Sequence, residues 1–309
     1  MGINRTLEEL GIHKRTFYNW YHRYRLTGGF TAPGAGTNSN KHRWNQIPQE
    51  QKNLIIELAL NHPTFSPREL AIRLSDEQGV FVSESSVYRL LKQRGLLTAP
   101  SHIVMQAADE FNKKTLFPNE MWQTDFTYFK VKGWGWYYLS TVLDDYSRYI
   151  IHWELCTTMQ AEDVKRTVLR AMGKANLKEG QRPKLLSDNG SCYIAGELKS
   201  FMQEEVKMKH IHGAPAHPQT QGKIERYHRT MKNVVKLEHY FLPEHLIAAI
   251  EEFVRFYNKQ RYHESLNNLT PEDVYLGRGD QILQQRKIIK EQSLKNRYFL
   301  FQQQKTKTA

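Results

Sequence analysis

The sequence predicts an α/β protein in which a mixed five-stranded sheet with flanking helices follows two small all-α modules. Before Trp122 the apolar residues recur at helical spacing. Aromatic and β-branched residues at strand spacing begin at Trp122, and helical and strand segments alternate from residue 160 onward. A length of 309 residues is sufficient for one sizeable core and one or two satellite domains.

The first module, residues 1–28, is predicted to be a helix-turn-helix. Residues 5–26 contain two short helical patterns around a turn at Gly11. Phe17 and Trp20 are expected in its core rather than stacked on DNA bases. Because the first helix starts almost at the first residue, the module is either minimal or partly encoded upstream. The residues expected to face DNA are Lys14, Arg15, Thr16, Tyr18, Asn19 and Arg23.

A second helix-turn-helix is predicted at residues 46–98, after a Gly-, Thr- and Asn-rich linker at residues 29–45. The Ser-Pro pair at Ser66 indicates a helix start, Ser83 is suited to cap another helix, and Gly79 is suited to the turn between them. The expected helices are Pro48–Leu60, Ser66–Leu74 and Ser83–Gln93, with core candidates Ile55, Ile56, Leu58, Val87, Leu90 and Leu91. The residues expected to face DNA are Ser85, Ser86, Tyr88, Arg89 and Lys92.

The largest domain is predicted at residues 118–280, after a second linker at residues 99–117, and it begins with three antiparallel strands. These strands are expected at 122–131, 134–145 and 149–157, joined by turns at Lys132-Gly133 and Asp145–Arg148. Next are expected an amphipathic helix at 160–177, a strand at Pro183–Ser187, a helix at Gly196–Val206 and a strand at His210–His212. The order β-β-β-α-β-α-β-α is that of the ribonuclease H architecture.

The segment 281–309 is predicted to be a basic tail. It contains seven Lys or Arg residues and one acidic residue, and its end is rich in Gln. This composition favours a solvated, partly disordered tail over a dedicated DNA-binding element.

Composition narrows the class of protein. Lys and Arg number 44 against 32 Asp and Glu, a formal charge of +12, which favours a polyanionic partner such as nucleic acid. Cys156 and Cys192 form no Cys-x-x-Cys motif, so neither a disulfide framework nor a zinc site is expected, even with His210, His212 and His217 nearby. No apolar run is long enough to span a bilayer and no signal peptide is present, so a cytoplasmic location without membrane contact is expected.

Three acidic residues are candidates for metal-dependent chemistry. Asp125 interrupts an apolar and aromatic strand, Asp188 follows another strand, and Glu225 lies in a predicted helix. A carboxylate within an apolar strand is costly unless it is paired or bound to a metal. Hard divalent cations relieve the repulsion between grouped carboxylates, and two such ions can activate an attacking oxygen and stabilise a leaving oxygen at one phosphorus.

Other acidic residues are better explained by local structure. Asp144 and Asp145 lie in a predicted turn, where aspartate commonly accepts hydrogen bonds from the backbone. Glu162 and Asp163 open a helix, where negative charge is favourable to the helix dipole.

The flanks of the three candidates resemble the integrase catalytic core shared by bacterial insertion-sequence transposases and retroviral integrases. The motifs are WQTDFTY around Asp125, SDNGS around Asp188, HPQTQGKIER around Glu225, and FYNKQRYHESLNNLTPEDVY beyond. The resemblance covers residues 118–280, with 36 residues between Asp188 and Glu225, one more than the family hallmark. Its N-terminal region lacks the zinc module of retroviral integrases and is similar to the bacterial transposase arrangement.

This resemblance implies that Asp125, Asp188 and Glu225 are both catalytic residues and metal ligands. It implies two Mg²⁺ ions, with Mn²⁺ as a substitute, and no organic cofactor. It also implies a dimer or larger homo-oligomer, because two ends of double-stranded DNA must be processed together, and it places His217 near the reacting phosphate, although a role in ordering the loop is equally compatible.

The helix around Glu225 is expected to have an apolar face and a DNA face. The DNA face carries Gln221, Glu225, Arg229 and Lys232 at three- and four-residue steps. For Lys223 and Arg226, contact with the DNA backbone and simple exposure to solvent are equally compatible. The apolar face carries Ile224, Tyr227, Met231, Val234 and Val235.

The predicted function is that of a DDE transposase, which binds the terminal inverted repeats of a mobile element, cleaves DNA and joins the freed 3′-hydroxyl to target DNA. Two alternatives remain at this point. A ribonuclease H-like nuclease would hydrolyse without joining, and a DNA-binding regulator derived from a transposase would do neither. The two helix-turn-helices argue against the nuclease, and the three retained acids argue against the regulator.

Overall fold

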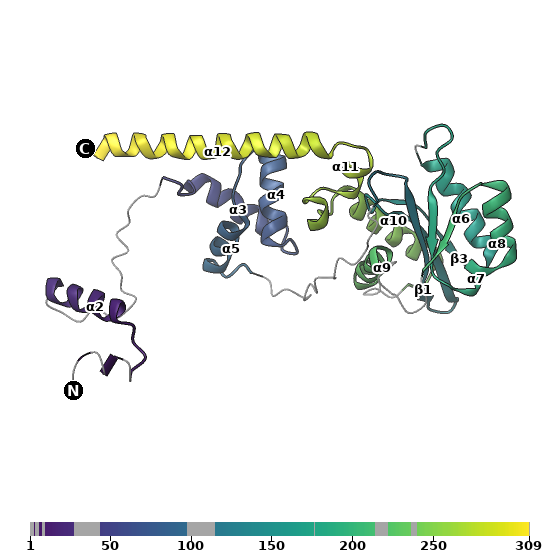
Figure 1. Ribbon diagram of the computed structural model, residues 1–309, viewed down its shortest axis with the longest axis horizontal. Coiled ribbons are helices and arrows are strands. Elements are labelled where there is room, and N and C mark those ends of the chain that lie inside the picture. The colour runs from purple at the N-terminus through teal and green to yellow at the C-terminus, as the bar shows by residue number, and fades with distance from the viewer. Residues whose placement is uncertain are drawn as a thin grey trace. The chain divides into compact units, whose positions relative to one another are not determined.

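The computed structural model describes most of the chain (Figure 1). The described residues are 3, 6–7, 10–27, 44–97, 115–175, 177–213, 222–235 and 240–308. By its contacts the chain divides into two compact units, one of Met1–Gln49 with Leu294–Ala309 and one of Glu50–Ser293. The catalytic candidates all lie in the second unit.

In the N-terminal segment, the turn at Gly11 and the helix after it are confirmed. Gly11 has a φ of 63°, and α2 extends over Lys14–Thr27. The prediction that Trp20 is a core residue is wrong, because its side chain is 39% exposed, whereas Phe17 is half-buried and stacks on Tyr21. A helix buries only the stripe of side chains that faces its partner, so side chains of α2 outside such a stripe stay exposed.

The second helix-turn-helix is confirmed as α3 (Gln49–Asn61), α4 (Pro67–Gln78) and α5 (Glu84–Gln93). The Ser66 hydroxyl accepts a hydrogen bond from the amide of Glu69 while the Glu69 carboxylate accepts one from the amide of Ser66, which forms a capping box. The Ser83 hydroxyl occupies the cap position of α5 but pairs with the Ser86 hydroxyl instead. Ile55, Leu70, Leu74, Val87, Leu90 and Leu91 are buried, whereas Ile56 and Leu58 are half-buried.

The predicted mixed five-stranded sheet is confirmed, with strand order β3-β2-β1-β4-β5. The strands are β1 (Met121–Val131), β2 (Gly135–Asp144), β3 (Ile150–Cys156), β4 (Lys184–Ser187) and β5 (His210–His212). The pairs β1–β2 and β2–β3 are antiparallel, and β1–β4 and β4–β5 are parallel. Because β4 pairs with β1 only over residues 121–123, the edge of β1 beyond Gln123 lies open on that side.

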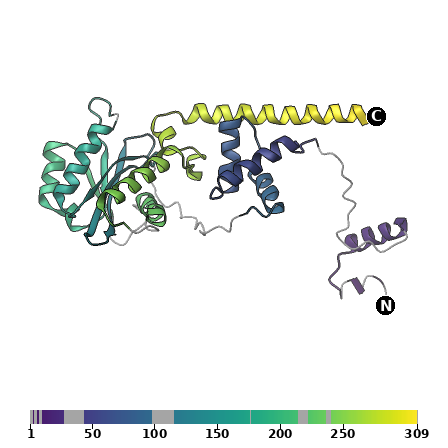
Figure 2. The same cartoon turned by 180° about the vertical axis from the view of Figure 1, so that it is seen from behind.

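Helices cover both faces of the sheet, as the two opposite views agree (Figures 1 and 2). One face is covered by α6 (Ala161–Lys174), α7 (Ser191–Ile194), α8 (Gly196–Ser200) and the π-helical turn η1 (Phe201–Glu205). The other is covered by α9 (Gly222–Val235) and α10 (Pro243–Lys259). The predicted helix at 196–206 is therefore α8 continued by a π-turn.

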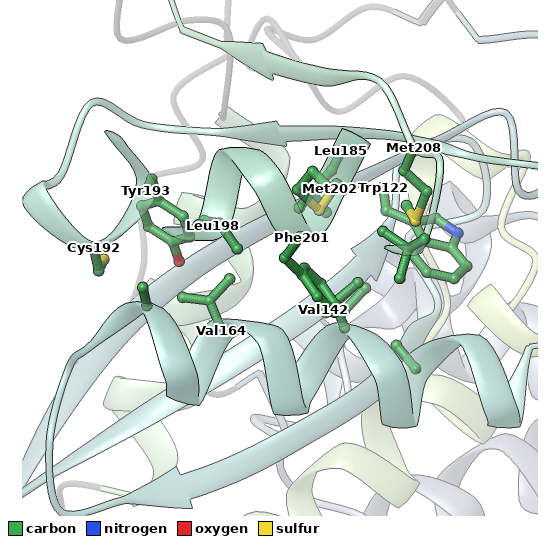
Figure 3. Packing of buried hydrophobic residues seen from close by; sticks show 14 of the residues in the cluster. Trp122, Val142, Val164, Leu185, Cys192, Tyr193, Leu198, Phe201, Met202 and Met208 are labelled. Atoms are coloured by element: carbon green, nitrogen blue, oxygen red, sulfur yellow. The ribbon is translucent and has the colours of Figure 1, made fainter. Parts of the chain in front are cut away.

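The two faces have separate apolar cores. Trp122, Val142, Val164, Leu185 and Phe201 lie between the sheet and α6–α8 (Figure 3). The second core, under α9 and α10, includes Phe129, Leu139, Ile224, Tyr227, Met231 and Val235. Val234, expected in the apolar stripe of α9, is 53% exposed, because it lies one residue away from Val235, which faces the sheet.

The prediction of a disordered tail is wrong, because α12 is a helix over Gly279–Thr308. It is ordered by partners far away in sequence. The Ser293 hydroxyl accepts a hydrogen bond from the Phe81 amide at 3.0 Å, and Arg286 donates to Asp76 at 2.7 Å. None of the helices in the described part of the chain, α12 included, is long and apolar enough to cross a membrane.

His263 is expected to make the free energy of unfolding of the second unit depend on pH. Burial first, and then the charges of Arg261, Arg148 and Arg226, lower the pKa of His263 to about 3, and its Nε2 atom is buried without a hydrogen-bond partner. The unfolded chain binds this proton near pH 6.5, so stability is present above pH 6.5 and is lost as the pH falls toward 3. The loss is at most about 1.4 kcal/mol for each pH unit.

We expect His263→Leu to reduce the loss of unfolding free energy on acidification, measured by urea unfolding from pH 7.5 to pH 4.5. The matched control is His245→Leu, since His245 is exposed. A His263→Leu profile that parallels that of the unmodified protein would show that this histidine is not the source of the acid sensitivity.

Candidate active site

Asp125 lies in the middle of β1 on the face that meets α9. Its Oδ1 atom accepts a hydrogen bond from the Phe126 amide at 2.8 Å, and its Oδ2 atom lies 3.3 Å from Nδ1 of His228. The side chain is 21% exposed, so the carboxylate is half-buried while it remains accessible from outside. A carboxylate in this setting is oriented from the protein side and open toward a ligand.

Glu225 lies in the first turn of α9, close to Asp125. The pKa of Glu225 is raised by burial and by the negative charge of Asp125, while Arg229 and His228 oppose the shift. The two carboxylates therefore repel each other, and a cation that binds both would relieve that repulsion. This oxygen-only pair fits a hard divalent cation.

Asp188 follows β4 at its carboxyl end and is exposed. Its Oδ1 atom accepts a hydrogen bond from the Gly190 amide at 2.9 Å, and a Cβ atom at residue 190 would lie 3.0 Å from that oxygen. Burial first, and then the charges of Asp188 and Asp125, raise the pKa of Cys192 to about 11. Both aspartates thus lie near the start of α7.

The structure therefore brings Asp125 and Glu225 together and places Asp188 near them, with its carboxylate turned toward Gly190. Over the described ranges, no three His, Cys, Asp or Glu side chains are close enough to hold a metal ion. The complete triad of metal ligands therefore remains a prediction.

A buried polar network connects β1 to the start of α9. Gln123, which is 1% exposed, donates from Nε2 to Asp145 Oδ1 at 2.7 Å and accepts from the Ile224 amide at 3.1 Å. The Lys223 ammonium donates to Asp145 Oδ2 at 2.7 Å. The network fixes the first turn of α9, and with it Glu225, relative to Asp125.

The structural interpretation of the rival acids is confirmed for Asp144 and Asp163, whereas the Asp145 carboxylate accepts hydrogen bonds from the side chains of Gln123 and Lys223. Asp144 is buried and accepts hydrogen bonds from the Asn119 amide, the Ser147 amide and the Ser147 hydroxyl. Burial raises its pKa, against the effect of these hydrogen bonds. Asp163 takes part in the capping interactions of α6 and pairs with Arg166 at 2.9 Å.

Two residues of the site were missed by the sequence analysis. His228 is buried, contacts Asp125 through Nδ1, and has an Nε2 atom without a hydrogen-bond partner. Gln123 links Asp145 to α9. The signal for Gln123 was available, because it is a second polar residue in the same apolar strand, two positions before Asp125.

The predicted DNA contacts stay predictions, but the structure shows where they lie. On α9, Arg226 and Arg229 are exposed, Lys232 is half-buried over the Tyr128 ring, and Lys223 is held by Asp145. His217 and Gln221 lie outside the described residues. Exposed on α2 and α5 are Lys14, Arg15, Thr16, Tyr18, Asn19, Ser85, Tyr88, Arg89 and Lys92, whereas Ser86 is half-buried and the side chain of Arg23 is not described.

Comparison with protein families gives consistent matches. The integrase core domain family matches residues 117–218, and a second family of the same description matches residues 206–271, so that together they span about half of the chain. A homeodomain-like domain family matches residues 16–91, from α2 to α5.

Individual proteins show the same similarity. A 31 kDa protein of insertion element IS600 from Shigella sonnei is 25% identical over 84% of this chain and 94% of its own length. The transposase of IS904 from Lactococcus lactis is 28% identical over 52% of this chain and 62% of its own length. Among solved structures, the HTLV-2 integrase catalytic core domain in complex with magnesium is 22% identical, with a TM-score of 0.41 over 52% of this chain and 98% of that one. The chain belongs to the proteins with an integrase core domain and is similar to the proteins of bacterial insertion sequences.

Proposed function

We propose that Asp125, Asp188 and Glu225 hold two Mg²⁺ ions at which this transposase cleaves DNA at the ends of a mobile element and joins them to target DNA. The observation that carries the proposal is the placement of Glu225, in the first turn of α9, beside the Asp125 carboxylate, whose negative charge adds to burial in raising the pKa of Glu225. Folding holds the two carboxylates together despite their repulsion. This is typical of a site at which a bound ligand relieves the repulsion.

The chain's own residues orient the reacting groups. His228 and the Phe126 amide hold the Asp125 carboxylate, and the Gln123 network fixes Glu225 at the start of α9. Arg226 and Arg229, exposed on the same helix, are placed to hold the DNA backbone. Bound divalent cations would supply activation of the attacking oxygen and stabilisation of the leaving oxygen.

The reaction has two phosphoryl transfers. Water attacks a phosphodiester at the element end, which breaks the bond to the 3′-oxygen and frees a 3′-hydroxyl. That hydroxyl then attacks a phosphodiester of the target, forming one bond as another breaks, so no serine or tyrosine nucleophile is needed. The helix-turn-helices hold the inverted repeats, and a dimer or larger assembly brings two ends together.

The test is a strand-transfer assay on labelled element ends with full-length protein and Mg²⁺. We expect both a shortened end and a longer, joined product. Cleavage without a joined product, under conditions in which a known transposase joins, would favour hydrolysis alone. Binding of the ends without any cleavage would favour a regulator.

A further inference from the structure

A cluster of exposed aromatic and basic side chains on the β1–β2 hairpin is not used by the proposed reaction. Tyr128, Lys130 and Trp136 belong to the two strands, and Lys232 reaches them from α9. Tyr128 is 50% and Trp136 is 52% exposed. We call these four residues the hairpin surface.

The side chains of the hairpin surface are contiguous. The rings of Tyr128 and Trp136 pack edge to face with centroids 5.4 Å apart. The ammonium group of Lys130 lies 5.8 Å from the Trp136 ring, and that of Lys232 lies 4.9 Å from the Tyr128 ring. Around the hairpin tip the same pairing recurs, with Lys132 5.3 Å from the exposed Phe241 ring, and Trp134 is 59% exposed.

The charged side chains of the hairpin surface are all positive. The sequence has no acidic residue from Phe126 to Leu143 or from Arg226 to Leu237. No ion pair to an acidic residue is formed by Lys130 or Lys132 within the described part of the chain. Exposed aromatic rings beside lysines on a surface without acids match a nucleic acid strand, whose bases stack and whose phosphates are negative.

The flat rings favour an unpaired strand over a duplex. In a duplex the bases are stacked on each other, so a protein that binds only the phosphates needs lysines but no exposed rings. A lysine over an exposed ring is held only weakly, so the lysines can move to phosphates when bases cover the rings.

The hairpin surface shares strand β1 with Asp125, and its β1 side chains face the other side of the sheet because side chains alternate along a strand. Asp125 and Lys130 are five residues apart on β1, which is about 17 Å along a strand. The edge of β1 beyond Gln123 has no strand partner on the β4 side, and the Lys232 ammonium reaches from α9 to the Tyr128 ring. We propose that the hairpin surface binds single-stranded DNA, with bases stacked on Trp136 and Tyr128 and phosphates on Lys130 and Lys232.

The test measures binding of a fluorescent oligo(dT) of about 20 nucleotides to the full-length protein in EDTA, so that the result does not depend on the metal site or on catalysis. We expect Trp136→Leu to weaken binding roughly tenfold and Trp136→Phe, which keeps a ring, to weaken it less. Lys130→Gln should reduce the salt dependence of binding, while Lys199→Gln on the exposed face of α8 should not.

The contact is located by photocrosslinking of the same oligonucleotide carrying 5-iododeoxyuridine. We expect a crosslink in the tryptic peptide 133–148, which contains Trp134 and Trp136. Crosslinks confined to the helix-turn-helices, or equal affinity of the Leu and Phe variants with the unmodified protein, would overturn the proposal. So would a Trp136→Leu variant that keeps its DNA affinity but loses its oligomeric state, because the surface would then bind protein.

Discussion

Replacement of Asp125 by asparagine is expected to reduce DNA cleavage by roughly a thousandfold or more, since a metal site contributes several kcal/mol to transition-state stabilisation. The same variant should bind element ends with unchanged affinity, because α2 and α5 are remote from Asp125 in sequence and carry the predicted reading residues. Its thermal stability should be equal or higher, because the substitution removes a negative charge that, after burial, raises the pKa of Glu225. Cleavage, end binding and thermal unfolding are measured on one preparation.

Glu197→Gln on α8 is the matched control, since the Glu197 side chain is 79% exposed. It should cleave as the unmodified protein does. Cleavage by Asp125→Asn at the rate of this control would remove Asp125 from the catalytic site.

Replacement of Gln123 by methionine is expected to lower both stability and activity. Methionine has a similar length but cannot accept from the Ile224 amide or donate to Asp145. Because Gln123 is buried, the free energy of unfolding should fall by about 2–4 kcal/mol, the cost of leaving buried polar groups unpaired. Cleavage should also fall at temperatures where the variant is fully folded, because the first turn of α9 no longer holds Glu225 in place.

Gln203→Met is the control for this substitution, since Gln203 is exposed in η1. Urea unfolding and a cleavage assay well below the unfolding transition separate the two effects. A Gln123→Met variant that is destabilised but fully active per folded molecule would show that the network stabilises the fold without positioning Glu225.

The sheet could be predicted because its sequence pattern is local. The strands β1, β2 and β3 are dense in aromatic and β-branched residues, and their observed bounds differ from the predicted ones by at most one residue. The failures concern contacts between distant segments. The composition of α12 is typical of a disordered tail, and its order depends on Phe81 and Asp76, each more than 200 positions away in sequence.

The residues of the candidate site could likewise be predicted only in part. Asp125 was recognisable because an unpaired carboxylate is unfavourable in an apolar strand. His228 was not, because a histidine in an amphipathic helix has many roles and only the fold brings its Nδ1 atom to Asp125. Asp188 was recognised by its motif, and the structure leaves its carboxylate bonded to the Gly190 amide.

The central claim is that the three acids form one metal centre, and Mn²⁺ binding measured by electron paramagnetic resonance tests it most directly. The protein is saturated with an element-end duplex and titrated with Mn²⁺, alongside Asp125→Asn, Asp188→Asn and Glu225→Gln. We predict that each substitution lowers the affinity or the number of bound ions, and that Glu197→Gln changes neither. Mn²⁺ binding by Asp188→Asn with the affinity and stoichiometry of the unmodified protein would contradict a centre formed by all three acids.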